Sequence, residues 1–156
     1  MNFNMIPKEN PRNRFLEHCV NKGDNFEVEI VHWRMVDNPV PPSNVFDVMG
    51  NECWNVYAII KSGHPLFDKL KDIKTDDYHG VMDRFPFDFH GGITYVHNNG
   101  DNIKVGDDYI HLGDELIERC SELPGEVKLE AKELFNFLEE ANNVYHKIVA
   151  RKLPYL

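Results

Sequence analysis

The feature that most constrains this chain is a long amphipathic pattern between residues 124 and 151. Apolar side chains recur there at alternating four- and three-residue steps, at Val127, Ala131, Leu134, Leu138, Ala141, Tyr145 and Ile148. This spacing places them on one face of a long helix, opposite many charged residues. Phe135 and Phe137 lie beside the stripe and indicate a second contact. The pattern favours packing across a sheet, and a homodimer through the C-terminal helix is the alternative.

The middle of the chain has the period-two pattern of β-strands. Residues 26–36 alternate, and a slip of the apolar phase at Ile30-Val31 predicts a β-bulge there. Further strands are predicted over 54–60, 93–96 and 103–110, with a hairpin turn at Asn99-Gly100. Residues 68–80 are polar and are expected to form a loop or one short helix.

A short N-terminal helix is also predicted. Asn10-Pro11 has the composition of a helix start, and Gly23 that of a helix end. Between them, apolar residues follow helical spacing at Phe15, Leu16, Cys19 and Val20. The expected fold is therefore α+β, with a small, mostly antiparallel sheet packed against a long C-terminal helix and this short N-terminal helix. At 156 residues, one globular domain spanning 1–156 is the default.

Charge and cysteine content narrow the classes of function. The formal net charge of −9 opposes binding to a nucleic-acid backbone, and no basic patch offsets it. The three cysteines are widely spaced and form no CxxC pair, which argues against a disulfide framework and a zinc knuckle. No secretion signal and no membrane-spanning run are evident, so a cytoplasmic protein is expected.

Three of the eight histidines lie at turn-like boundaries beside small residues: His64, His90 and His111. Asp108 and Asp114 each lie three residues from His111, so a tight turn would bring these groups to one side. Imidazole and carboxylate together suit acid–base chemistry near neutral pH. The candidate catalytic residues are therefore His90, His111 and Asp114, whereas Asp88 and Asp107 are expected to be solvated.

The same residue types also suit a divalent metal, for which His90, His111 and Asp108 are the candidate ligands. A ligand site is predicted from loop and strand-start residues, in which Gly91-Gly92 offers backbone N–H groups to an anion. Its members are His64, Gly91, Gly92, Thr94, Tyr95 and Asp108. No serine-hydrolase, zinc-protease or nucleotide-binding motif accompanies these residues.

Three segments, in this order, resemble a family of small phage and prophage proteins that carries GHPLY, HGGLTY and GFDxAHxGD motifs. The matching segments are 63–67, 90–95 and 106–114, and the resemblance covers roughly residues 53–145. The family's aromatic residue in the third motif is replaced here by Asp107, which makes the loop more polar. The resemblance implies an origin more than an activity.

Three functions remain open at this point. The first is a phage-type accessory protein that binds a small nucleotide-like ligand or a host protein, with a role in countering host defence from the host cytoplasm. The second is a hydrolase of phosphodiesters or nucleotides, in which His90 and His111 act with or without a divalent metal. The third is an accessory protein of the virion.

Overall fold

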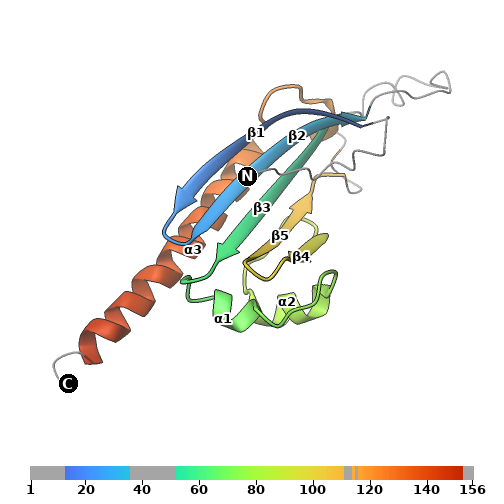
Figure 1. The fold of residues 1–156 in the computed structure, drawn as a ribbon. Helices are drawn as coiled ribbons and strands as arrows, with labels where there is room; N and C mark the ends of the chain where they lie inside the picture. Colours follow the sequence, from blue (N-terminus) through green and yellow to red (C-terminus); the bar gives the residue numbers. More distant parts are fainter. Residues whose placement is uncertain (1–12, 36–51, 111–113, 115, 153–156) are drawn as a thin grey trace.

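The computed structural model describes residues 13–35, 52–110, 114 and 116–152. The strands are β1 (Asn13–Gly23), β2 (Phe26–Met35), β3 (Glu52–Lys61), β4 (Tyr95–Asn98) and β5 (Asn102–Asp108). The helices are α1 (Phe67–Leu70), α2 (Tyr78–Arg84), the 3-10 helix η2 (Ile117–Arg119) and α3 (Gly125–Lys152). The strands form one sheet in the order β1-β2-β3-β5-β4, and each neighbouring pair is antiparallel (Figure 1). The predicted α+β class is confirmed.

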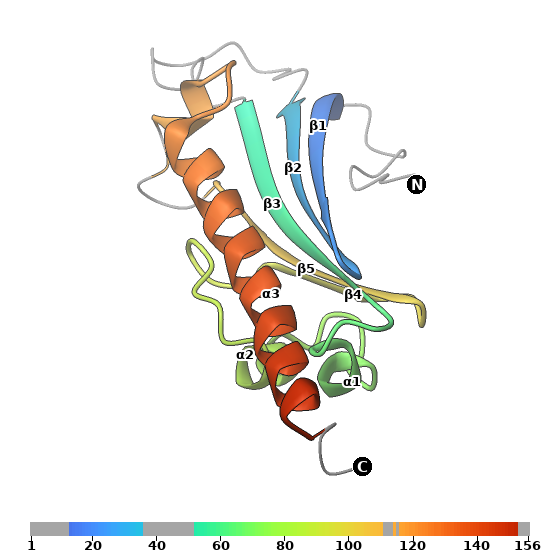
Figure 2. The same cartoon turned by 90° about the vertical axis from the view of Figure 1, so that its left-hand side faces the viewer.

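The long C-terminal helix crosses one face of the twisted sheet, as Figure 2 shows. It packs on β2 and β3 through the predicted stripe, in which Val127, Leu134 and Leu138 are fully buried. On the sheet side, Val28, Val56 and Ala58 belong to the same core. Within the described ranges, no helix has the length and apolar character that crossing a bilayer requires.

The second contact of α3 is made by aromatic side chains beside that stripe. The Phe135 ring lies 5.0 Å from the ring of Phe26, measured between centroids. The Phe137 ring lies 5.3 Å from that of Phe85, in the segment that follows α2. The helix therefore holds the segment between α2 and β4 as well as the sheet.

The N-terminal segment is a strand, so the predicted short helix is wrong. Residues 13–23 pair with β2 along their whole length in an antiparallel hairpin. Asn25 lies in the turn with φ of 61°, a left-handed conformation that asparagine tolerates better than most residues. Helical spacing expresses a local preference worth less than about 1 kcal/mol per residue, which the ladder of the hairpin outweighs. The predicted helix start at Asn10-Pro11 lies outside the described residues.

The β-bulge also lies elsewhere than predicted. The register of β2 is continuous through Ile30 and Val31, and the irregularity falls in β1 between Phe15 and Glu17. Ile30 and Val31 point to opposite faces, yet both are at least nine-tenths buried. A strand that is buried on both faces can carry apolar residues on either side, so its apolar phase can reverse without a bulge.

The remaining elements position the segment that carries His90. The β4–β5 turn forms at Asn99-Gly100 as predicted, and Gly100 takes a φ of 91°. Residues 68–80 contain most of α1 and the start of α2, where a loop or one short helix is predicted. Residues 85–94 form no regular helix or strand, and Gly91 and Gly92 there have φ of 66° and 88°. Glycine adopts these angles without the strain that a side chain would cause.

Candidate functional site

A cavity of about 340 Å³ lies where the segment after α2, the end of β5 and the first turns of α3 meet. We call it the acidic cavity. It is lined by Asp88, Phe89, His90, Gly91, Tyr109, Glu126, Leu129, Glu130 and Glu133. No lysine or arginine is among these lining residues, so the charge at its wall is negative.

The strand β5 leads to the acidic cavity, and Tyr109 immediately after it is a lining residue. The side chains of β5 alternate between the two sheet faces, and Ile103, Val105 and Asp107 are on the face that α3 covers. Asp107 is fully buried, so the expectation that it is solvated is wrong. Tyr109 follows two residues later and is also buried. The Asp107 carboxyl group therefore lies on the buried face of β5, where the alternation predicts an aliphatic side chain such as those of Ile103 and Val105.

His90 is held in the cavity wall by three contacts. Its backbone N–H donates to Glu130 Oε2 at 2.7 Å, and its ring stacks on Tyr109 with centroids 4.2 Å apart. Its Nε2 lies 2.7 Å from Oδ1 of Asp114, which is almost completely buried. The His90 side chain is 34% exposed, so it remains accessible from solvent. A buried carboxylate that contacts one ring nitrogen fixes the orientation of the ring.

Beneath His90 lies a pair of buried carboxyl groups, Asp107 and Glu130, which we call the carboxyl pair. Asp107 and Glu130 hydrogen-bond to each other, and Glu130 Oε1 receives no N–H donor from the described residues. Burial, together with the adjacent Glu130 carboxyl, raises the pKa of Asp107 to about 11. Asp107 therefore keeps its proton at neutral pH and presents it to Glu130.

Tyr109 completes the cluster as a neutral hydroxyl group. Burial raises the pKa of Tyr109 far above its ordinary value, and the negative charges of Glu130 and Asp107 add to this effect. The phenol therefore remains protonated and presents a donor and an acceptor at the cavity wall.

Of the predicted catalytic residues, the structure brings His90 and Asp114 together, although they are 24 residues apart. His111 lies outside the described residues. Asp108 points to the face opposite Asp107, and its carboxylate accepts a hydrogen bond from the Ile110 N–H at 3.2 Å. Among the described residues, no group of three or more histidine, cysteine or acidic side chains is arranged to hold a metal.

The predicted ligand residues divide between several places. Gly91 lines the acidic cavity, and Gly92 lines a neighbouring hollow with Phe87 and Ile93. Tyr95 is on the opposite face, with its ring centroid 5.4 Å from that of Tyr57. The Thr94 N–H donates to the Gly106 carbonyl and extends the pairing of β4 with β5.

His64 is part of the scaffold in this structure. Its Nδ1 accepts a hydrogen bond from the Leu66 N–H at 3.1 Å, so Nε2 carries the proton and donates to the Leu138 carbonyl at 3.0 Å. Burial lowers the pKa of His64, which keeps the ring neutral. The side chain joins the turn after β3 to α3 and does not line the acidic cavity.

Glu130 and Tyr109 are the functional residues that sequence reasoning missed. Glu130 lies three residues after Val127 and four before Leu134, which places it on the buried face of α3. Tyr109 continues the alternation of Val105 and Asp107. An acid within a helical apolar stripe was therefore the signal for this site.

A second polar group lies on the opposite face of the sheet. Lys61 Nζ is 2.9 Å from Glu27 Oε1, and Lys104 Nζ is 3.2 Å from Glu29 Oε2. We call these the opposite-face ion pairs. Lys104 Nζ also lies 4.5 Å from the centre of the Tyr57 ring. Burial raises the pKa of Glu29 and lowers the pKa of Lys104, while each charge favours the ionised form of its partner.

Comparison with models of protein families, with curated proteins and with solved structures found no match for this chain. The evidence for a function is therefore the chemistry of the acidic cavity itself.

Proposed function

We propose that this protein binds a small organic ligand in the acidic cavity, through amino or imino N–H groups of the ligand. The observation that carries the proposal is Glu130. It lines the cavity, it is 7% exposed, and its Oε1 receives no N–H donor from the described residues, so the proton of the neighbouring Asp107 carboxyl is what it has inside the protein. A ligand N–H group would add a donor to this buried and poorly solvated carboxyl group.

The lining selects among ligand classes. Acidic side chains at Asp88, Glu126 and Glu133 repel an anion, and no basic lining residue opposes them. A nucleotide-like ligand would therefore enter with its base, and its phosphates would remain outside. The His90 ring, stacked on Tyr109, offers an aromatic face to a flat heterocycle. The favoured class is an amino-substituted heterocycle or a small organic cation.

The biological setting belongs to the same proposal. The resemblance of residues 53–145 to small phage and prophage proteins supports a ligand taken from the host cytoplasm. Sequestering such a ligand would counter a defence pathway that depends on it.

The test uses the full chain and three probes: adenosine, adenosine monophosphate and spermidine. Isothermal titration calorimetry should detect adenosine or spermidine, and the monophosphate should bind more weakly than adenosine. Glu130→Gln should weaken binding about tenfold or more, because it removes a charged acceptor. Glu139→Gln is the matched control, since this residue is exposed on the same helix and does not line the cavity. Equal binding to the wild type and Glu130→Gln would contradict the proposal.

Acid–base catalysis is the second candidate function, and the 2.7 Å contact between His90 Nε2 and Asp114 Oδ1 favours it. Asp114 would orient the ring and stabilise the imidazolium that forms when His90 accepts a proton. The acidic lining opposes an anionic phosphodiester, so binding of a neutral or cationic group ranks first. Turnover of bis(p-nitrophenyl) phosphate that Asp114→Asn reduces, with the fold unchanged by circular dichroism, would reverse this order.

A further inference from the structure

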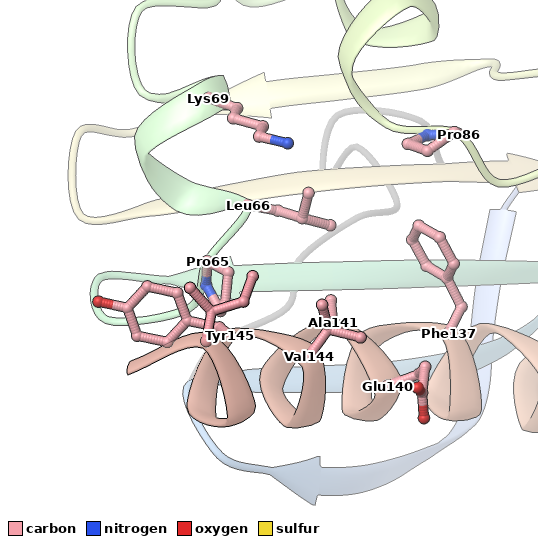
Figure 3. Close-up of a pocket in the computed structure, with 10 residues that line it drawn as sticks. Pro65, Leu66, Lys69, Pro86, Phe137, Glu140, Ala141, Val144 and Tyr145 are labelled. Atoms are coloured by element: carbon pink, nitrogen blue, oxygen red, sulfur yellow. The ribbon is translucent and has the colours of Figure 1, made fainter. Parts of the chain in front are cut away.

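A second hollow lies further along α3, toward its C-terminal end, and none of its lining residues belongs to the acidic cavity. This apolar groove has a volume of about 550 Å³. Figure 3 shows Leu66, Lys69 and Pro86 on one side of it, with Phe137, Ala141 and Val144 of α3 on the other. Pro65, Glu140, Tyr145 and Ile148 complete the lining.

The helix α3 carries two apolar stripes that share Ala141 and Ile148, and Phe137 of the second stripe contacts Phe85 while the C-terminal part of that stripe is exposed. The first stripe includes Leu134 and Leu138 and is buried against the sheet. The second runs through Phe137, Ala141, Val144 and Ile148, at steps of four, three and four residues. Val144 and Ile148 are 45% and 48% exposed, and Tyr145 beside them is 51% exposed. Steps of this kind form the seam along which two helices pack as a coiled coil.

The charged residues beside the second stripe are spaced so that they would form ion pairs with a second copy of the same helix. Glu140 and Lys147 both lie next to the seam, immediately before Ala141 and Ile148, and both are exposed. If two such helices pack antiparallel, Ala141 of each meets Val144 of the other. The same register brings each Glu140 beside Lys147 of the other copy. Each copy then supplies one Glu140 and one Lys147, so the two ion pairs are related by the two-fold axis of the dimer.

We propose that the apolar groove is a homodimer interface, in which the C-terminal half of α3 from a second copy of this chain packs antiparallel against its equivalent. Val144 and Ile148 of each copy enter the groove of the other, between α3 and the wall formed by Pro65 and Leu66. The two symmetry-related Glu140–Lys147 pairs lie along one edge of the seam. The interface is independent of the acidic cavity, so failure of either proposal leaves the other intact.

Analytical ultracentrifugation of the full chain over a range of concentrations tests the interface. The wild type should sediment as a dimer with a concentration-dependent monomer fraction. Val144→Asp and Ile148→Asp should each raise the dissociation constant about tenfold or more, because each buries a carboxylate in an apolar seam. Leu116→Asp is the matched control, since Leu116 is 73% exposed and does not line the groove.

Charge exchange then tests the antiparallel register. Glu140→Lys and Lys147→Glu should each weaken the dimer, because each places like charges together across the seam. The variant that carries both changes restores opposite charges and should return the dissociation constant toward that of the wild type. A monomeric wild type at every concentration would overturn the proposal. So would a dimer that tolerates Val144→Asp, or a double variant no better than the singles.

Discussion

The two polar groups on opposite faces of the sheet differ in how their charges are balanced. On the opposite face, Glu27 and Glu29 each have a lysine within 3.2 Å. In the acidic cavity, which holds Glu130 of the carboxyl pair, no lysine or arginine is among the described lining residues. Each group includes a buried residue of β5, Lys104 in one and Asp107 in the other. The two groups therefore differ in charge balance and not in burial.

This difference teaches which buried acids serve the scaffold. An ion pair whose partners come from the same sheet has its charge balanced within the chain, and it restricts how the strands align. A carboxyl pair at the wall of a cavity is incomplete without a proton or a ligand. Such unbalanced groups are where a binding site is expected, because a scaffold gains nothing from leaving them unmatched.

The largest expected effect comes from breaking an opposite-face ion pair. Lys104→Met leaves Glu29 buried without its cation, and this should lower the free energy of unfolding by about 3–5 kcal/mol. Urea denaturation at pH 7 measures the loss. The variant Glu29→Gln/Lys104→Met should recover much of it, because no lone charge is then buried. A single variant as stable as the wild type would show that these pairs are not structural.

The next largest effect on stability is expected at His64, and a smaller one at His90. His64→Gln removes a ring whose two nitrogens bond to backbone groups, and this should cost about 1–3 kcal/mol. His90→Gln should cost less than about 1 kcal/mol, because the His90 side chain is one-third exposed and its pair with Asp114 is partly solvated. Thermal unfolding of both variants at pH 7 compares them. Equal losses would contradict the assignment of His64 to the scaffold and His90 to the site.

His64 also predicts a pH dependence. Its pKa is lowered in the folded protein from an ordinary value of 6.5, so the unfolded chain takes up its proton first. The stability that neutral His64 contributes is present above pH 6.5 and is lost as the pH falls through the lowered pKa. Chemical denaturation between pH 7.5 and pH 5 should show this slope in the wild type and a reduced slope in His64→Gln.

A smaller effect with the opposite sign is expected from the carboxyl pair. The pKa of Asp107 is raised, so the folded state holds a proton that the unfolded chain releases, and stability falls as the pH rises. Asp107→Asn removes this requirement and should stabilise the protein by about 1 kcal/mol at pH 8. The gain should shrink toward pH 5. Destabilisation at both pH values would mean that the carboxyl pair is a structural element.

The smallest effect on stability is expected at the cavity rim. Glu133→Gln changes an exposed side chain and should alter the free energy of unfolding by no more than about 0.5 kcal/mol. It should still weaken binding of spermidine, because one negative charge at the wall is lost. Calorimetry at low and high salt measures this, and the difference from wild type should diminish as salt screens the charge.

Local periodicity accounts for the elements that were predicted well. The stripe from Val127 to Ile148 gave the long helix, and Asn99-Gly100 gave the hairpin, because each signal depends on neighbours within a few residues. Residues 13–23 carry the same kind of helical signal and form β1. Their conformation depends on pairing with β2, and local spacing does not encode that pairing.

The candidate site was predicted in part. His90 and Asp114 were identified by residue type and by the small residues near them, although nothing local indicated that they touch. Asp107 was misplaced because an acid at the end of a strand is ordinarily solvated. Glu130 was missed because charged residues on α3 were assigned to its solvent side.

The sequence by itself determined the long helix, most of the strands and the acidic balance of the chain. The helix and strands follow from the periodicity of apolar residues within short segments, and the acidic balance follows from the number of charged residues. The tertiary structure alone decided that β5 and α3 bring Asp107 beside Glu130, with His90 above them. That meeting depends on which elements pack together, and the free energy of that packing is summed over the whole core.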